Sequence, residues 1–556
     1  MSQSRALNNS QLIRAAIIVL IGFLASGVLG FVRTGILSAQ FGTSEAHDAF
    51  LAAQRIPEII FVLVAGGALG SSFIPIYAKR READENEAWR LASAVMTLAS
   101  VAAAVLGIVV ALFADPLVQF VLLPQSSPEI QALTANMTRM MMVTPFIFAI
   151  SGLIMGILQS HGLFLLPSIA ISMNNIGIMI GALLIAPLVT SDPYVAVDVI
   201  SGSSAIAITG LNTLPVDQVG NASVYGLAYG AILSAVLHLV FNAVGLFSIK
   251  AKLRPNFNPR IEGVSEVLKL MIPRVLGLGV VQINFLVNIV LSDGMVEGSF
   301  VALTTAFTLM FFAIGIIGQS VGSALFPTLS ALYAENDMDG FKDRLASAMR
   351  SVLFLAFPAT VAFIVMGEPI VSIFERGEWT SESTQGTAWA LAFYATGIAG
   401  FVLLEVLSRA FYALADTWTP VKIGIGAMLS NIVFSLIFIQ FIGNPDNLAR
   451  GSFAGLALAN ASTTLVESLI LWWLISKRVG GIHDRFIISG SLKAIIASLI
   501  MGIVLYFLPN FVPFTGFPLA LAGAVIGGLA FFGIAIALGL DEAKVVPMMI
   551  LRRFRR

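Results

Sequence analysis

Charged side chains within long apolar stretches are the residues of this sequence best placed to do chemistry. The candidates are Arg33, Asp48, Arg55 and Arg274. A charge at the centre of a lipid bilayer costs about 2.5–3.5 kcal/mol on insertion scales unless it faces water or a partner. These positions therefore indicate a polar binding site or pathway for an ionic group inside the membrane.

Each candidate also has a structural interpretation. Arg33 could belong to an internal ion pair, or its side chain could reach the outer interface. Arg55 and Glu58 are three residues apart on one expected helix, so they could neutralise each other. Asp48 could lie at the outer mouth of a cavity, or it could begin a helix, where a carboxylate is favoured. Arg274 lies near the inner end of its expected helix and could meet lipid headgroups. Binding and structural roles stay open for all four candidates.

The composition argues against catalysis and metal chemistry. The chain has no cysteine, and its four histidines are far apart in sequence, so thiolate chemistry is excluded and no metal-ligand spacing is present. No Ser/His/Asp set or phosphate-binding glycine loop stands out. The 31 basic and 31 acidic residues balance, which gives no electrostatic reason to expect a nucleic-acid partner. We predict a protein that is not an enzyme and uses no metal or other cofactor.

The elements that must position these charges are transmembrane helices. The chain has 556 residues, of which 58% are hydrophobic and 11% charged, too few polar residues for a soluble globule of this size. The apolar stretches approach or exceed the roughly 20 residues of a membrane-spanning helix and lack the alternation of barrel strands. We predict an all-α polytopic membrane protein with about 14 transmembrane helices, at residues 12–40, 49–78, 91–113, 134–158, 163–188, 222–248, 265–292, 299–333, 347–367, 386–412, 420–442, 451–476, 491–510 and 516–540.

Basic residues are distributed unequally between the connecting loops. If the N-terminus is cytoplasmic, one set of loops collects most of the lysines and arginines, whereas the opposite loops hold little more than Arg376 and Arg450. Cytoplasmic loops carry such an excess in membrane proteins. We therefore expect both termini to be cytoplasmic.

An internal repeat divides the chain. The segment around Pro75 recurs around Pro327, and the segment ending at Pro167 recurs in the one ending at Pro420, at offsets of about 252 to 254 residues. Because the offset contains six spans, the halves have the same orientation, as in transporters built of parallel repeats around a central cavity. We expect two pseudo-symmetric six-helix lobes, 1–250 and 251–482, followed by two additional helices and a basic tail in 483–556.

Helix-breaking residues occupy corresponding positions in the two halves. Gly66, Gly67 and Pro75 interrupt the second predicted helix, and Pro327 interrupts the eighth. Proline removes a backbone hydrogen bond and glycine permits close helix contact, so these positions predict either static kinks or helices that bend in function. Arg409 and Asp416 flank a predicted cytoplasmic turn, where we expect a structural clamp.

Several motifs together resemble one family. They are Ser26-Gly-Val-Leu-Gly-Phe-Val-Arg33, Ala39-Gln-Phe-Gly42, Asp48-Ala-Phe50, Arg55-Ile-Pro57, Phe73-Ile-Pro75, Thr138-Arg139, Gln159-Ser-His-Gly-Leu-Phe, Pro273-Arg274, Phe374-Glu-Arg-Gly377 and Arg409-Ala-Phe-Tyr412 through Thr419-Pro-Val-Lys422. In this order they resemble the MurJ/MviN lipid II flippases of the multidrug/oligosaccharidyl-lipid/polysaccharide exporter superfamily.

The resemblance implies a function. Such a protein moves the undecaprenyl-diphosphate-linked peptidoglycan precursor from the cytoplasmic to the outer leaflet of the bacterial plasma membrane by alternating access, and so serves cell wall biogenesis and cell shape. The substrate-binding residues would be Arg33, Asp48, Arg55 and Arg274, with guanidinium groups holding phosphate oxygens. The implied partners are the lipid-linked glycan precursor, membrane lipids, a coupling ion and cell-wall synthesis proteins. The last two helices would accommodate the prenyl tail.

This chain departs from the family pattern at several charged positions. Gly27 and Thr34 replace an arginine and an aspartate in the first helix, while Phe61, Val62 and Gly66 replace charges in the second. An Asp-Arg pair of the eighth helix falls on Phe307-Thr308. These departures leave three alternatives open: an exporter of another lipid-linked glycan, an exporter of small amphipathic compounds, and a non-transporting scaffold for envelope synthesis.

Overall fold

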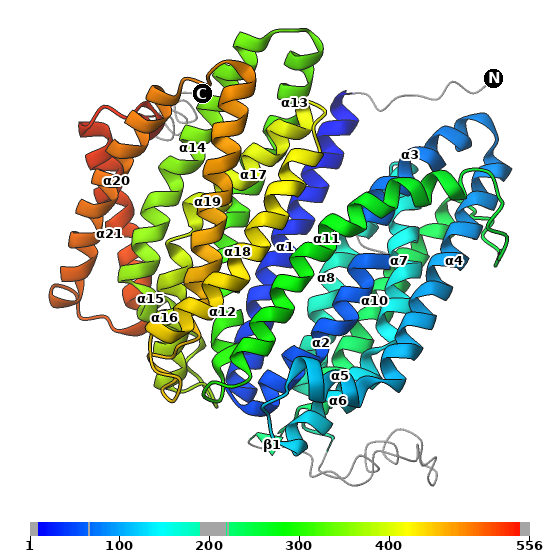
Figure 1. Cartoon of the computed structure of the whole chain (residues 1–556), viewed down its shortest axis with the longest axis horizontal. Helices are drawn as coiled ribbons and strands as arrows, with labels where there is room; N and C mark the ends of the chain where they lie inside the picture. Colours follow the sequence, from blue (N-terminus) through cyan, green and yellow to red (C-terminus); the bar gives the residue numbers. More distant parts are fainter. Residues whose placement is uncertain (1–8, 65–66, 190–217, 220–221, 545–556) are drawn as a thin grey trace. The chain divides into compact units, whose positions relative to one another are not determined.

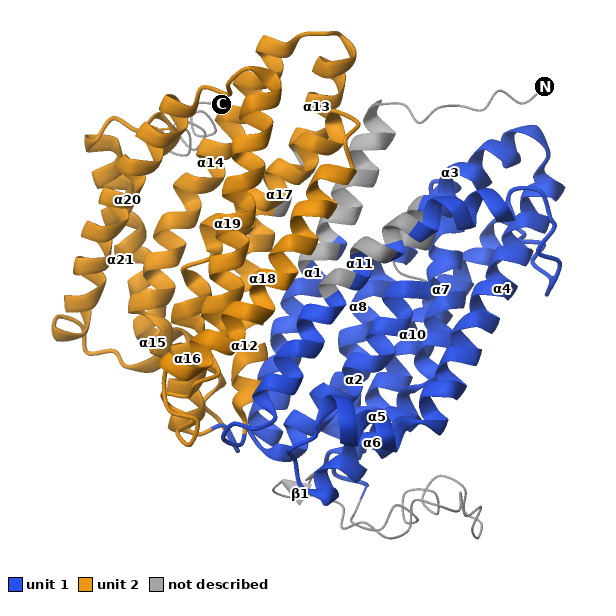
Figure 2. Ribbon diagram, in the orientation of Figure 1, with its two compact units in different colours: residues 1–297, 377–379 blue, residues 298–376, 380–556 orange. Residues whose placement is uncertain are grey.

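The computed structural model describes residues 9–64, 67–189, 218–219 and 222–544, and most of these residues are helical. Contacts divide the chain into two compact units (Figure 2). Unit 1 comprises residues 1–297 and 377–379, and unit 2 comprises residues 298–376 and 380–556. This division places the seventh predicted span in unit 1. The lobes predicted from the repeat, 1–250 and 251–482, with 483–556 as a separate segment, stay a prediction.

Unit 1 is a bundle of long helices (Figure 1). Its helices are α1 (Asn9–Phe41), α2 (Glu45–Val64), α3 (Gly67–Ala83), α4 (Glu85–Leu112), α5 (Ala114–Leu117), the π-helical turn η1 (Val118–Leu122), α6 (Pro128–Met141), α7 (Val143–Ser160), α8 (Leu165–Ile180), the π-helical turn η2 (Gly181–Ile185), α10 (Tyr225–Ser248) and α11 (Val264–Ser292). Two short antiparallel strands, β1 (Gln218–Val219) and β2 (Ala222–Ser223), precede α10.

Unit 2 is also helical (Figure 1). Its elements are α12 (Ser299–Ile314), the π-helical turn η3 (Gly315–Gln319), α13 (Ser320–Ala334), α14 (Met338–Val365), α15 (Gly367–Val371), the 3-10 turn η4 (Ser372–Phe374), α16 (Ser381–Ala395), α17 (Ile398–Ala413), α18 (Trp418–Phe441), α19 (Ala454–Val479), α20 (Asp484–Phe507), the 3-10 turn η5 (Leu508–Asn510) and α21 (Gly516–Ala537).

The helices agree with the predicted number of membrane spans. Within the described residues, ten helical segments are long and apolar enough to cross a membrane, and the pair α16–α17, bent by 48°, makes an eleventh. The other three predicted spans correspond to α1, the α2–α3 pair and α11, which contain or adjoin residues whose side chains are not described. The prediction of an all-α polytopic membrane protein is confirmed.

In each unit an aspartate caps the start of a long helix. In unit 1, Asp84 caps α4 by accepting a hydrogen bond of 2.7 Å from the backbone N–H of Asn86. In unit 2, Asp337 caps α14 through the backbone N–H of Gly340 at 2.9 Å. A carboxylate at this position satisfies backbone donors that lack helical partners and favours the positive end of the helix dipole. Both caps follow a proline-containing helix, as the sequence repeat predicts.

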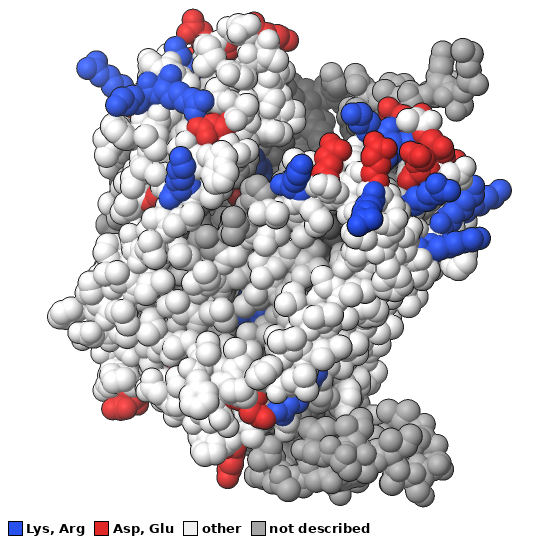
Figure 3. Space-filling model, turned by 45° about the vertical axis from the view of Figure 1, so that its right-hand side comes forward, with Lys and Arg blue, Asp and Glu red and all other residues white. Residues whose placement is uncertain are grey.

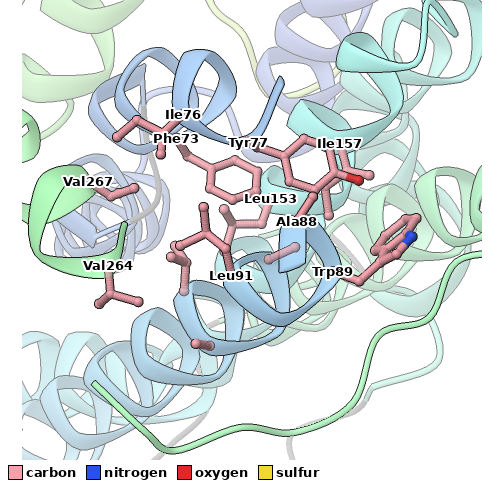
Figure 4. Close-up of a cluster of buried hydrophobic side chains, with 13 residues drawn as sticks. Phe73, Ile76, Tyr77, Ala88, Trp89, Leu91, Leu153, Ile157, Val264 and Val267 are labelled. Atoms are coloured by element: carbon pink, nitrogen blue, oxygen red, sulfur yellow. The ribbon is translucent and has the colours of Figure 1, made fainter. Parts of the chain in front are cut away.

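One hydrophobic cluster of unit 1 joins four helices (Figure 4). Phe73 and Tyr77 of α3 pack with Leu91 of α4, Ile157 of α7 and Val267 of α11, all buried. Burial of large apolar side chains stabilises this junction. The cluster therefore fixes α11 against the helices that carry the charged end of unit 1.

Helices α8 and α10 approach each other closely because both carry glycines four residues apart. A Cβ atom on Gly177 would lie 2.3 Å from the Cα of Ser234, and one on Gly181 would lie 2.5 Å from the Cα of Gly230. A Cβ on Gly226 would lie 2.3 Å from the Cα of Ala186. Small residues spaced in this way allow the backbone contact that drives helix association in membranes.

The last two helices belong to unit 2, where they pack with α14. Phe354 of α14, Met501 of α20 and Phe531 of α21 are buried in one apolar cluster. Arg350 of α14 forms an ion pair with Glu542, just beyond α21, and lies 4.1 Å from the centre of the Phe486 ring in α20. This polar link and the apolar cluster together attach α20 and α21 to unit 2.

Charged side chains gather at the ends of the helices in each unit, and few lie between them (Figure 3). In unit 1, the end of α3 carries Arg80, which pairs with Glu87 at 3.6 Å and Glu262 at 3.1 Å. Near the far end of α4, Arg139 pairs with Asp115. This distribution matches the partition of charge between a bilayer core and its two interfaces.

Candidate functional site

The candidate site of unit 1 is a cluster of charges on α1 and α2. Arg55 donates from Nη1 to Glu58 Oε2 at 2.8 Å, one helical turn away on α2. Glu58 also interacts electrostatically with Arg33 of α1. The structure thus brings together three of the charges that the sequence places in separate apolar stretches. Glu58 carries one negative charge, whereas Arg33 and Arg55 carry two positive charges. The cluster therefore has a net positive charge.

The guanidinium of Arg55 has a second neighbour on α11. Its Cζ atom lies over the Phe285 ring, 4.4 Å from the ring centre. The Nε atom of Arg55 is buried and has no hydrogen-bond partner among the described residues. A guanidinium stacked on an aromatic face keeps its in-plane donors directed outward. Arg55 can therefore hold an anion while it remains paired with Glu58.

Amide side chains of α11 flank this aromatic contact. The side-chain oxygens of Gln282 and Asn284 are buried and have no hydrogen-bond partner within the described part of the chain. Buried polar atoms without partners cost about 1–3 kcal/mol each. Their clustering near Phe285 in the sequence marks this part of α11 as polar rather than as part of the apolar core.

Asp48 occupies the start of α2. Its backbone N–H donates to the carbonyl of Ser44 at 3.1 Å, and its carboxylate lies in the first helical turn, where the helix dipole favours it. The adjacent His47 is buried and hydrogen-bonds through Nδ1 to the carbonyl of Gly42 at 2.8 Å. This geometry fits the helix-start interpretation of Asp48; substrate binding by Asp48 stays a prediction.

Two further candidates lie partly or wholly outside the described residues. Arg274 belongs to α11, but its side chain is not described. Gly66 lies in the undescribed segment 65–66, and Gly67 is the first residue of α3. Binding by Arg274 and bending at Gly66 and Gly67 therefore stay predictions.

The prolines predicted as breakers lie within continuous helices, and in unit 2 a π-helical turn precedes one of them. Pro75 lies inside α3 and Pro327 inside α13, both with exposed side chains. In unit 2 the π-helical turn η3 separates α12 from α13 and contains Gly315 and Gly318. Such turns widen the backbone hydrogen-bond pattern and are frequent at functional positions of helices. The eighth predicted span is thus one interrupted helix; whether it moves is a separate matter.

Arg409 and Asp416 have different partners. Arg409 of α17 pairs with Glu405 one turn earlier, and a Cβ on Gly322 of α13 would lie 2.3 Å from its Nη1 atom. Asp416 accepts hydrogen bonds at the start of α18 from the backbone N–H of Thr419 at 3.0 Å and from its hydroxyl at 2.7 Å. It also pairs with Arg478 of α19.

The structure adds residues that sequence reasoning missed. Phe285 gave no signal because it is one apolar residue among many on α11. Glu405 stands four residues before Arg409, and this spacing could have indicated their pair. Ser151 of α7 and His238 of α10 form a buried hydrogen bond of 2.7 Å, which Asn242 joins at 3.1 Å. Only the His238–Asn242 spacing was visible in the sequence.

The family model described as "Lipid II flippase MurJ" matches residues 37–524. The chain belongs to the MurJ family. A protein of Burkholderia cenocepacia named "Lipid II flippase MurJ" is 28% identical over 472 residues, with 83% of this chain and 84% of that protein covered. A "Probable lipid II flippase MurJ" of Bdellovibrio bacteriovorus is 26% identical over 550 residues, with 96% of each chain covered.

Solved structures agree on the fold. A structure titled "Lipid II flippase MurJ, inward closed conformation" superposes with a TM-score of 0.72 at 23% identity and covers 93% of this chain and 98% of its own. An inward-facing multidrug resistance MATE family transporter superposes with a TM-score of 0.62 at 16% identity and covers 84% and 99%. This multi-pass membrane protein therefore has the fold of the MurJ family, which MATE-like transporters share.

Proposed function

We propose that this chain is a lipid II flippase. It moves the undecaprenyl-diphosphate-linked peptidoglycan precursor from the cytoplasmic to the outer leaflet by alternating access. The observation that carries the proposal is the charge cluster of unit 1, with Arg33, Arg55 and Glu58 together on two membrane helices, in a chain that belongs to the MurJ family. A transporter rather than an enzyme follows from the same family.

The proposed headgroup site contains Arg33, Asp48, Arg55 and Arg274. Guanidinium groups bind phosphate oxygens in pairs of parallel hydrogen bonds, and such charge-assisted bonds are about twice as strong as neutral ones. Glu58 keeps part of the positive charge compensated when the site is empty. A diphosphate then binds to donors of the guanidinium groups that Glu58 does not occupy, and the retained pair limits the net charge, which supports reversible binding.

The proposed path of the prenyl tail lies along the last helices. An apolar pocket of about 310 Å3 lies between α14 and α20 in unit 2. Its lining includes Val361 and Val365 of α14 and Leu499, Ile503 and Phe507 of α20. A hydrocarbon chain gains from burial against such a surface, so this pocket supports a tail-binding role for the region.

The proposed setting is the bacterial plasma membrane, with both termini cytoplasmic. The basic residues at the end of α3 and in the final turn of α19 then lie on the cytoplasmic side, as the positive-inside rule requires. In this scheme Gly66, Gly67, Pro75 and Pro327 permit bending, while Arg409 and Asp416 hold helices in unit 2. A coupling ion and cell-wall synthesis proteins are proposed further partners.

Complementation tests this function. A bacterium depleted of its own lipid II flippase receives the full chain, Arg33→Ala, or Arg139→Ala as a control that changes an arginine in the Asp115 pair. We expect rescue by the wild type and Arg139→Ala but not by Arg33→Ala, because Arg33 supplies charge to the headgroup site. Membrane expression of each variant is measured by immunoblotting.

Lipid II accessibility at the outer leaflet is the second readout. It should fall in the depleted cells and return only with the rescuing variants. Failure of the wild type to restore it, despite normal membrane expression in two different hosts, would refute lipid II translocation. Drug efflux by the same wild-type cells would then support export of small amphipathic compounds.

A further inference from the structure

We propose that Phe285 is a positioning residue that holds the guanidinium of Arg55 in the orientation needed to bind a diphosphate. This inference rests on the proposed function, and it assigns a role to an apolar residue of α11. The Arg55 guanidinium lies over the Phe285 ring, with the Cζ atom 4.4 Å from the ring centre.

An arginine side chain has considerable conformational freedom. A guanidinium on a flexible stem can adopt many orientations, and each fixed rotamer costs entropy. Glu58 restrains Arg55 through one nitrogen, with Nη1 2.8 Å from Oε2. One hydrogen bond leaves the plane of the guanidinium free to rotate, so a second contact is needed to fix it.

Phe285 provides that contact from another helix. Attraction between the cation and the aromatic face holds the guanidinium over the ring, and stacking of the two planes is the arrangement that we propose. Since the hydrogen-bond donors lie in the guanidinium plane, stacking directs them away from Phe285. The Nε donor is buried and has no hydrogen-bond partner among the described residues, so a phosphate oxygen that enters when the site opens would satisfy it.

Because Phe285 belongs to α11, the orientation of the Arg55 side chain depends on the position of this helix. This helix packs against α2 and α3 within unit 1, and its start is fixed by Val264 and Val267 in the apolar cluster of Figure 4. Relative movement of α2 and α11 would remove the ring from the guanidinium. The contact therefore makes the affinity for the headgroup depend on how these two helices pack.

The test measures binding of lipid II to the purified full-length chain in nanodiscs. We expect Phe285→Leu to raise the Kd about 3- to 10-fold, the range of a cation–π contact that is partly shielded from water. Phe285→Tyr keeps an aromatic face and should bind within about twofold of the wild type. Phe247→Leu is the matched control, because Phe247 of α10 is exposed and lies outside the proposed site.

A double-mutant cycle separates positioning from a general loss of structure. In an Arg55→Gln background, Phe285→Leu should have no further effect on the Kd, because the group it orients is absent. If Phe285 had only a structural role, Phe285→Leu would raise the Kd by the same factor in the wild type and in the Arg55→Gln variant. If Phe285→Leu does not reach the membrane, Phe285→Met, which also lacks the ring, replaces it.

The outcomes are distinguishable. If the wild type and Phe247→Leu fail to bind lipid II, the proposed function fails. If both bind and Phe285→Leu binds equally well, the positioning role is refuted while the proposed function stands. A raised Kd in Phe285→Leu that persists in the Arg55→Gln background also refutes positioning.

Discussion

Both units place an Arg–Glu pair on a membrane helix, but the surroundings of the two pairs differ. In unit 1, Glu58 pairs with Arg55 and also interacts with Arg33, and Arg55 stacks on Phe285. In unit 2, Arg409 pairs with Glu405 and lies against Gly322, a residue of the helix that follows the π-helical turn η3. The first arrangement leaves positive charge for a ligand, whereas the second packs its charge against a broken helix.

This difference shows how similar ion pairs can serve two tasks in one chain. Both pairs follow the same local rule, that charges three or four residues apart on a helix can meet. A third charge on α1 makes the pair of unit 1 suitable for anion binding. A glycine opposite the pair of unit 2 admits the guanidinium close to a neighbouring backbone, which suits it to hold an interrupted helix in place.

The largest effect is expected when the charges of the Arg55–Glu58 pair and of the Arg409–Glu405 pair are removed in separate variants. If the two variants behaved alike, the two pairs would not have different tasks. Arg55→Gln combined with Glu58→Gln should lower the affinity for lipid II in nanodiscs at least about tenfold, because one charge-assisted hydrogen bond is worth roughly 1.5–3 kcal/mol. Arg409→Gln combined with Glu405→Gln should leave lipid II affinity within about twofold, because that pair makes no proposed headgroup contact.

Thermal unfolding of the same two double variants provides the control. The unit 2 variant should lose stability by about 1 kcal/mol, the net worth of a partly buried hydrogen bond, while the unit 1 variant should change less. Loss of lipid II affinity in the unit 2 variant with affinity retained in the unit 1 variant would reverse the assignment of tasks.

The sequence alone predicted the helices and two of the charged candidate residues. Apolar stretches of about 20 residues predicted the helices, while bending at Pro75 and Pro327 stays a prediction from the repeat. Arg33 and Arg55 were recognisable as site candidates because a charge in an apolar stretch is costly and needs an explanation. These predictions depend on local composition alone, which one sequence displays.

Contacts between distant residues were much harder to predict. Phe285 lies 230 residues after Arg55 in the sequence, and an apolar side chain on an apolar helix has no distinguishing pattern. The pairing of Asp416 with Arg478 likewise depends on how α18 and α19 pack. Helix periodicity indicates on which face of a helix a residue lies. Tertiary packing determines which residue of another helix it contacts there.

Two glycines, one in each unit, differ in how closely they approach a neighbouring helix. A Cβ on Gly181 of η2, the continuation of α8, would meet the Cα of Gly230 at 2.5 Å, whereas a Cβ on Gly426 of α18 would meet nothing within 4 Å. Gly181→Ala should therefore destabilise the protein by about 1–3 kcal/mol through overpacking. Gly426→Ala is the matched control and should change stability by at most about 1 kcal/mol, in the stabilising direction.

Thermal unfolding in one detergent measures both glycine variants. A larger loss in Gly426→Ala than in Gly181→Ala would show that the close backbone approach at Gly181 does not determine how much a methyl group costs at these two positions. Equal, small effects would show that α8 and α10 can separate by a few tenths of an ångström without cost.

The smallest expected effect concerns the ion pair that joins α18 to α19 in unit 2. Partial burial alone would raise the pKa of Asp416, but hydrogen bonds from Thr419 and the pair with Arg478 together lower it below its usual value. A carboxylate with a lowered pKa in the folded state stabilises the protein above its unfolded pKa of about 3.9. This contribution is lost as the pH falls through the folded pKa.

Asp416→Asn should therefore be less stable than the wild type at pH 7 and approach it at acidic pH. Because Arg478 is nearly half exposed, solvent screens the pair and limits the difference to about 1 kcal/mol or less. Thermal unfolding between pH 7 and pH 3 measures it, with Arg478→Gln as the partner variant. A stability difference that stays constant over this pH range would mean that Asp416 acts through its hydrogen bonds to Thr419. An amide oxygen accepts these bonds only in part. The charge of Asp416 would then contribute nothing to joining α18 and α19.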